Sequence, residues 1–362
     1  MISSLNLTIS ASFLTAFLIT LLITPISIYL FKRYRIIDDP KRKHPGVIHK
    51  KPVPRGGGIP LFLGVLGASL IFIPITGTTA AIFIASFIAL SIGILDDKFD
   101  TSPYLRFFIN IICAVIVVAA GINVPFITNP FGGILYLNQI FLPLDIFGLD
   151  IRIVLSDLIA VFWIVWVMNM LNWSKGVDGQ MPGIVAISAL VIGILSLRFA
   201  QLDETSIMGA KLSFIIAGSA LGFLIFNFYP AKIFPGYGAT SIYLLLSVVA
   251  ILSSAKLATA MLVMGIPLSD GVYTIFRRMV SGRSPFWHDK KHFHHLLLSW
   301  GFSQRKVALF YWGISAILGA LSLVLSSKGK LFAIIMVAVL VGGAILFLNF
   351  LLKKNHNDKV AI

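Results

Sequence analysis

Residues 331–351 read LFAIIMVAVLVGGAILFLNFL, a run without a charged side chain. About 20 consecutive apolar residues span the hydrocarbon core of a bilayer as a helix, because a helix satisfies its own backbone hydrogen bonds there. Residues 11–31 and 152–171 form runs of similar length. These runs predict an all-α polytopic integral membrane protein.

The composition of the whole chain agrees with this prediction. Of its 362 residues, 58% are hydrophobic and 12% are charged, and the mean hydropathy is +0.95. A water-soluble domain normally carries about twice that charged share. The composition therefore excludes a soluble enzyme, a nucleic-acid-binding protein and a secreted disulfide scaffold. The single cysteine, Cys113, lies inside an apolar run and offers no disulfide framework.

The apolar runs predict about 10–11 transmembrane helices in a single domain over 1–352, followed by a short, disordered cytoplasmic tail at 353–362. Short runs such as 239–254 could lie tilted or half-buried. The segment 121–151, rich in Gly and Pro, is typical of an irregular loop or hairpin outside the membrane. The predicted spans are 11–31, 58–76, 79–95, 104–120, 152–171, 183–199, 209–227, 239–254, 256–275, 305–325 and 331–351.

The distribution of basic residues predicts the orientation of these spans. Loops rich in Lys and Arg stay on the cytoplasmic side, and nine of the 29 basic residues lie between Lys32 and Arg55. We therefore expect a multi-pass plasma membrane protein with its N-terminus outside, and 11–31 as a retained first span. By parity the cytoplasmic segments are 32–57, 96–103, 172–182, 228–238, 276–304 and the tail from 352.

Five polar clusters fall on that cytoplasmic side. The first, at 38–58, contains the turn Pro52-Val-Pro-Arg55-Gly-Gly-Gly, whose backbone N–H groups and cations suit a phosphate or an anionic lipid. Its Lys and Arg content alone is also typical of an ordinary positive-inside loop. The second is Asp96-Asp97, two adjacent carboxylates that only a cation, a proton transfer or water can stabilise at a membrane interface. Their side chains point about 100° apart on a helix end, so only one need face a site.

The remaining clusters offer metal ligands, aromatic rings and cations. The polar turn at 169–180 has amide and carboxylate oxygens that a hard cation prefers, although such residues favour any loop. The aromatics of 226–241 could flank a nucleobase or form an interfacial belt. The segment 277–295 holds four of the seven histidines. It fits a phosphate clamp, with Arg277, Arg283 and the imidazoles as donors, better than a zinc site or a solvated basic loop.

Taken together, these loops place phosphate-binding cations, carboxylates and aromatic rings at one membrane surface. The substrate pair that suits them is a nucleotide diphosphate compound and a lipid phosphate. Phosphoryl transfer between two such reactants needs charge neutralisation and positioning rather than covalent help from the protein.

At these motifs the chain resembles the polyprenyl-phosphate N-acetylhexosamine-1-phosphate transferases of glycosyltransferase family 4. The resemblance runs from about Asp38 to His295 and rests on the order and spacing of the motifs. The spaced His292-x-His294-His295 looks like the branch that uses UDP-N-acetylglucosamine and undecaprenyl phosphate, because the muramoyl-pentapeptide branch has three consecutive histidines. This resemblance implies transfer of N-acetylhexosamine-1-phosphate, first of all GlcNAc-1-phosphate, from a UDP-sugar to polyprenyl phosphate. UMP is released, and lipid-linked glycan assembly for a cell wall or polysaccharide begins.

The resemblance also implies partners and residue roles. The partners are UDP-N-acetylhexosamine, polyprenyl phosphate and membrane lipids, with no nucleic acid and a homodimer left open; the cofactor is Mg²⁺, with Mn²⁺ as an alternative. Asp96, Asp97 and Asp178 are the catalytic positions, the first two beside the acceptor phosphate and the third near the uridine or sugar. Asn172 would help hold the metal. The substrate-binding positions are His49, Arg55, Arg106, Asn172, Lys175, Gly236, Arg283, His292, His294 and His295.

Two positions depart from the family's pattern. Lys175 stands where the family commonly has the first Asp of Asp-Gly-x-Asp-Gly, and Tyr237 stands in place of a principal Mg²⁺-binding Asp. Tyrosine is no hard anionic ligand at neutral pH. Metal binding could have moved to Asn172, Asp178 and the substrate phosphates, or Lys175 could supply some of the positive charge.

Two other functions are alternatives to the transferase. A catalytically degenerate homologue would bind polyprenyl phosphate or the UDP-sugar without turnover. A transporter is disfavoured because the polar residues lie in loops on one face rather than at the bilayer midplane.

Overall fold

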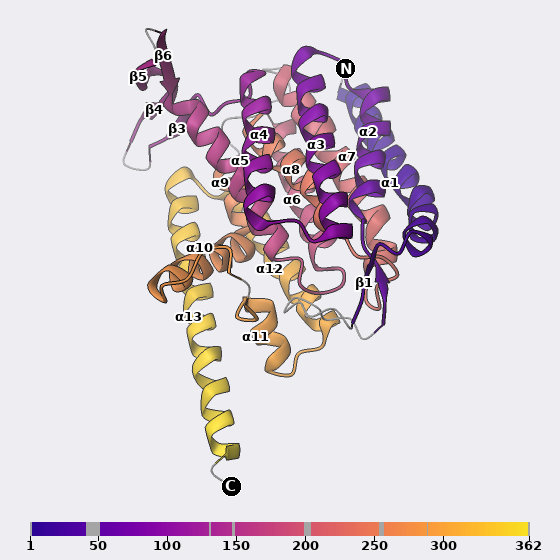
Figure 1. Ribbon diagram of the computed structural model, residues 1–362. Helices are drawn as coiled ribbons and strands as arrows, with labels where there is room; N and C mark the ends of the chain where they lie inside the picture. Colours follow the sequence, from indigo (N-terminus) through magenta and orange to yellow (C-terminus); the bar gives the residue numbers. More distant parts are fainter. Residues whose placement is uncertain are drawn as a thin grey trace.

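The computed structural model describes residues 2–40, 51–129, 132–146, 149–198, 204–252, 257–287 and 289–360. They form a bundle of helices with short two-stranded ribbons (Figure 1), which confirms the all-α polytopic prediction. The helices are α1 (Ile2–Arg33), α2 (Gly58–Phe72), α3 (Gly77–Phe99), α4 (Pro103–Ala119), α5 (Leu155–Trp173), α6 (Gln180–Leu197), α7 (Glu204–Asn227), α8 (Thr240–Ile251), α9 (Leu257–Val263), α10 (Gly265–Val280), α11 (Phe293–Ser299), α12 (Gln304–Val324) and α13 (Ser327–Val360). The strands and 3-10 turns are β1 (Ile37–Asp38), β2 (Val53–Pro54), β3 (Phe126–Thr128), β4 (Ile134–Tyr136), η1 (Leu137–Gln139), β5 (Phe141–Ile146), β6 (Leu149–Val154) and η2 (Tyr237–Ala239).

Every predicted span corresponds to apolar helix, but the helices differ in length. In the part of the chain that the structure describes, seven helices are long and apolar enough to cross a membrane: α1, α3, α5, α6, α7, α12 and α13. α2, α4 and the segment Tyr237–Ile251 are shorter apolar helices. The bent pair α9 and α10 could form an eighth span. The predicted 10–11 spans therefore include three helices that are short for a full crossing.

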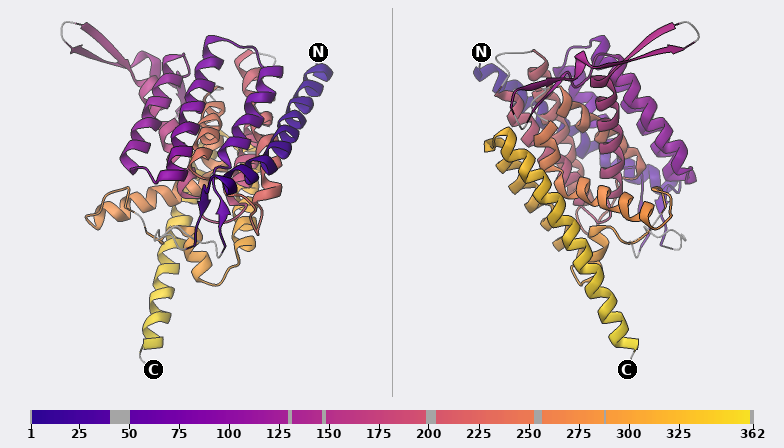
Figure 2. Two further views of the ribbon diagram at one scale, coloured as in Figure 1. Left: turned by 45° about the vertical axis from the view of Figure 1, so that its right-hand side comes forward. Right: turned by 90° about the vertical axis from the view of Figure 1, so that its left-hand side faces the viewer.

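The predicted span at 256–275 is divided into two helices. α9 and α10 meet at Met264 with an angle of 83° between them. Pro267 follows three residues later; it has no N–H to donate, and its ring would clash with the carbonyl of residue 263 in a continuous helix. The helix is therefore interrupted here, and α10 lies across the end of the bundle (Figure 2).

Helix α8 is the centre of the bundle. All its residues, Thr240 to Ile251, are buried, and it packs against α2, α3, α5, α6 and α7. A helix that is apolar all round must be enclosed by other helices or lipid. The outer helices instead expose large apolar side chains, among them Leu22 and Phe332, as expected for surfaces in contact with lipid tails.

The two ends of the bundle differ in character. The antiparallel hairpins β3–β4 and β5–β6 lie near the N-terminus, at one end, and confirm the predicted hairpin in 121–151 (Figure 1). The ribbon β1–β2, α10 and α11 lie at the opposite end. α13 runs past that end as a helix to Val360. The prediction of a disordered tail from 353 is therefore wrong for the backbone up to that residue.

Candidate active site

A cavity of about 450 Å³ lies at the end of the bundle formed by β1–β2, α10 and α11. Five stretches of chain that are far apart in sequence line it, so the predicted convergence of the polar loops is confirmed. The lining residues are Asp38, Arg55, Asp96, Asp100, Thr101, Pro103, Arg106, Asn169, Asn172, Trp173, Lys175, Gly176, Phe234, Tyr237, Arg278, Phe286, Trp287, Asp289, His292, His294 and His295.

Asp96 lines the cavity at the end of α3, next to a short turn that its own residues stabilise. Asp100 adopts a left-handed conformation that ends α3, and the Ser102 side chain caps α4 with Pro103 at its first position. This tight turn brings Arg106 back over Asp96, whose two oxygens accept from Arg106 Nη1 at 3.0 and 3.1 Å. The carboxylate therefore fixes the direction of a guanidinium that lines the cavity.

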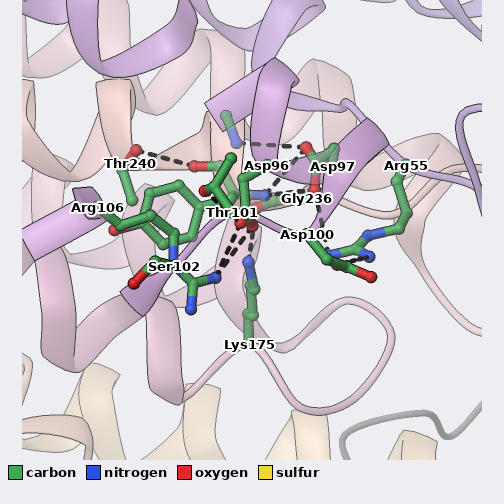
Figure 3. A network of polar contacts seen from close by, with 12 residues as sticks. Arg55, Asp96, Asp97, Asp100, Thr101, Ser102, Arg106, Lys175, Gly236 and Thr240 are labelled. Carbon is green, nitrogen blue, oxygen red and sulfur yellow. Dashed lines mark hydrogen bonds and ion pairs between the residues drawn. The ribbon is translucent and has the colours of Figure 1, made fainter. Parts of the chain in front are cut away.

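Asp97 does not line the cavity; it holds the turn at 236–238 (Figure 3). Its carboxylate accepts from the backbone N–H of Tyr237 at 2.8 and 3.0 Å and pairs with Arg55 at 3.2 Å. Gly236 has φ +68°, and a Cβ there would come within 2.1 Å of Asp97 Oδ2. The two adjacent carboxylates thus have different surroundings, as their helical spacing predicted.

Lys175 reaches the same turn from the loop after α5. Its ammonium donates to the Gly236 carbonyl at 2.8 Å and lies 5.5 Å from the centre of the Tyr237 ring. Burial lowers the pKa of Lys175 to about 7, although Asp97 favours the charged form. Asn172 lies on the cavity wall, and its buried Oδ1 has no hydrogen-bond partner. The loop thus places one cation and one unpaired oxygen at the cavity.

The histidine segment is organised by an acid that the sequence analysis did not assign a role. Asp270 Oδ2 lies 2.9 Å from His292 Nδ1, and Thr274 and Arg278 also contact that ring. These three residues recur at intervals of four along α10 and so share one face of the helix. That four-residue spacing was the signal in the sequence that could have assigned Asp270 to the site. It also explains why Arg278 lines the cavity. The predicted Arg277 does not line it, although it pairs with Asp289, which does.

His294 and His295 are neutral groups at physiological pH. Burial and the neighbouring His295 and His292 hold the pKa of His294 well below its usual range. Burial, His292 and Lys290 lower the pKa of His295 to about 4. Both ring nitrogens of His294 are buried without a hydrogen-bond partner. These rings can therefore donate or accept hydrogen bonds, but they bring no positive charge.

Some predicted site residues lie elsewhere. Asp178 is buried and is not on the cavity wall; its Oδ2 accepts from the backbone N–H of Ala231 at 2.9 Å. Arg283 is exposed and stacks on Trp287, 3.7 Å from the ring centre, without lining the cavity. His49 lies outside the described residues. The structure thus gives Asp178 a place in a buried turn and brings neither it nor Arg283 to the site.

The donor set does not fit a hard divalent cation. Mg²⁺ prefers octahedral oxygen ligands with carboxylates among them. Asp96 and Asp97 already accept from guanidinium and backbone N–H groups, and the Lys175 ammonium lies beside that turn. Within the described ranges, no group of three or more His, Cys, Asp or Glu side chains is placed to hold a metal. Mg²⁺ or Mn²⁺ at Asn172 stays a prediction.

Comparison with known proteins gives the family. A family model described as Glycosyl transferase family 4 matches residues 79–254. A Bacillus subtilis protein, named probable undecaprenyl-phosphate N-acetylglucosaminyl 1-phosphate transferase, is 30% identical over 92% of this chain and 89% of its own length. The chain belongs to glycosyl transferase family 4. In Mycolicibacterium smegmatis, a family relative named decaprenyl-phosphate N-acetylglucosaminephosphotransferase is 31% identical over 91% of this chain and 85% of its own. The Haemophilus influenzae undecaprenyl-phosphate alpha-N-acetylglucosaminyl 1-phosphate transferase is 30% identical, over 97% and 94%.

Proposed function

We propose that the chain transfers N-acetylhexosamine-1-phosphate, first of all GlcNAc-1-phosphate, from a UDP-sugar to polyprenyl phosphate. The observation that carries this proposal is the meeting of Arg55, Arg106, Lys175 and Arg278 around one cavity at the end of a membrane bundle. A diphosphate donor and a phosphate acceptor bring strong negative charge, which such cations neutralise. The relatives named above are called transferases of this kind.

The cavity walls suit the two halves of the reaction. Trp173, Phe286 and Trp287 offer aromatic faces for the uracil or sugar ring. In the proposed reaction, an oxygen of the lipid phosphate bonds to the phosphorus that bears the sugar. The bond between that phosphorus and the oxygen that links the two phosphates breaks, and UMP leaves with the electron pair. Asp96 orients Arg106 towards the reacting phosphates and so assists the attack.

The proposed location is a plasma (inner) membrane with the cavity on the cytoplasmic side. The sequence of residues 32–55 is rich in Lys and Arg, and its described strands β1 and β2 lie at the cavity end. Such loops stay cytoplasmic.

The direct test is an assay of the purified chain in detergent. It receives labelled UDP-N-acetylglucosamine and undecaprenyl phosphate, with Mg²⁺ in one series and with EDTA in another. We expect equal amounts of UMP and lipid-linked GlcNAc, with unlabelled UDP-N-acetylgalactosamine as the competitor that tests sugar choice. Binding of either substrate without product in both series would support the degenerate homologue. Flux of labelled sugar into liposomes without lipid product would support transport.

The pH profile should report the state of Lys175. Its lowered pKa of about 7 results first from burial; Asp97 and Asp96 favour the ammonium, while Arg55 and Arg106 oppose it. The charged form exists below that pKa, so kcat/KM for the UDP-sugar should fall about tenfold per pH unit above about pH 7. Lys175→Arg should remove this fall, because a guanidinium stays charged to pH 12 or above. An identical fall in the Arg variant would assign the titration to another group.

A further inference from the structure

A cation of the protein itself, the Lys175 ammonium, lies against the turn at 236–238 that Asp97 holds. Figure 3 shows the Lys175 side chain rising from its loop towards Gly236, between Arg106 and Arg55. One N–H of the ammonium donates to the Gly236 carbonyl at 2.8 Å, and Lys175 also lines the cavity. An ammonium has three donors. It can therefore keep this anchor and still donate to an anionic group in the cavity.

Tyr237 supports this cation in two ways. Its ring lies under the Lys175 ammonium at 5.5 Å and under the Arg106 guanidinium at 4.9 Å, where the electron-rich face attracts cations. Its hydroxyl accepts from Asn110 Nδ2 at 3.1 Å inside the bundle, so its oxygen points away from a ligand role. Its backbone N–H is held by Asp97. Lysine and tyrosine at these two positions thus act together.

We propose that the Lys175 ammonium takes the charge role of a divalent cation, and that this chain transfers the sugar phosphate without a metal bound by the protein. The inference rests on the proposed function, because it takes a nucleoside diphosphate compound as the anion. The oxygens of Asp96 and Asp97 are taken by N–H donors, and a dication at the turn would be repelled by Lys175. One P–O bond forms, one breaks, and the proton stays on Nζ throughout.

Activity without metal is the first measurement. The purified protein and both substrates are freed of metal with EDTA, and turnover is compared with and without added Mg²⁺. We expect the two rates to agree within about twofold. In EDTA, Lys175→Met should lower kcat by about 10²–10³-fold, as expected when one charge-stabilising donor is removed. A rate that collapses in EDTA and returns with Mg²⁺ would overturn the proposal, as would full activity of Lys175→Met.

Metal binding is measured separately, by titration with Mn²⁺ followed by electron paramagnetic resonance. The unmodified protein should show no Mn²⁺ site that depends on Asp96, and the double variant Lys175→Asp, Tyr237→Asp should gain one. Its matched control is Lys328→Asp, Tyr136→Asp, which makes the same exchanges in the first turn of α13 and in β4, at residues that do not line the cavity. Tyr237→Asp alone serves if the double variant does not fold.

The two measurements, turnover without metal and Mn²⁺ binding, test this proposal and the proposed function separately. If the protein shows no turnover in any condition, the transferase assignment fails, and the Mn²⁺ titration still decides the charge role of Lys175. A tight Mn²⁺ site in the unmodified protein that Asp96→Asn abolishes would overturn the proposal, whether or not the protein is active.

Discussion

Asp96→Asn should lower kcat by about 10²–10³-fold, the cost of losing a well-placed charged donor in a phosphoryl transfer site. Both oxygens of Asp96 hold Arg106 Nη1, and Oδ1 also accepts from Thr101 Oγ1 at 2.8 Å. An amide keeps one acceptor but loses the charge, so the guanidinium is no longer fixed towards the cavity. Rates are measured with labelled UDP-N-acetylglucosamine, and folding is followed by the melting temperature in detergent. Stability should change far less than activity.

The pH dependence of this variant separates two roles for Asp96. The second pKa of a phosphate monoester is about 6, so the lipid phosphate loses its own proton above that pH. If Asp96 orients Arg106, the loss should persist from pH 6 to pH 9. Recovery of the variant at high pH would instead show that Asp96 removes a proton. Asp157→Asn, the same change at the far end of α5, is the matched control and should leave kcat unaltered.

The sequence predicted the helices and the convergence of the polar loops, because both follow from local signals. Apolar length indicates a span, and a Pro or Gly cluster indicates where it ends. The sequence analysis predicted a span at 256–275 but not the break in it, although Pro267 carried the signal for that break. At this position a single residue without an N–H outweighed the apolar composition on both sides of it.

The sequence did not predict which of two neighbouring side chains faces the cavity. Asp96 lines it and Asp97 does not, and Arg278 lines it in place of Arg277. Each choice depends on the phase of a helix against its neighbours, which is a tertiary property. Asp178 shows the same limit, because it follows the expected motif yet holds the backbone of Ala231. Motif spacing therefore predicted the loops of the site better than the roles of single residues.

Gly93→Ala should both destabilise the protein and abolish most of its activity. A Cβ at Gly93 would lie 2.3 Å from Gly238 Cα and 2.4 Å from its backbone nitrogen, closer than any side chain contact allows. The obstacle is backbone, which cannot rotate away, so α3 and the turn at 236–238 must separate. That movement would stretch the Asp97 hydrogen bonds and shift the carbonyl that anchors Lys175. Overpacking of this kind costs about 1–3 kcal/mol, before the loss of hydrogen bonds to a charged group is added.

Gly77→Ala is the matched control, because it places the same methyl on the same helix. Nothing lies within 4 Å of a Cβ at Gly77, and alanine favours helix over glycine by about 0.5–1 kcal/mol. The melting temperature should therefore fall by several degrees for Gly93→Ala and stay equal or rise slightly for Gly77→Ala. Equal stability and equal turnover of the two variants would mean that α3 does not press on the turn. The placement of Asp97, Lys175 and Tyr237 around one point would then have to be abandoned, since all three depend on that contact.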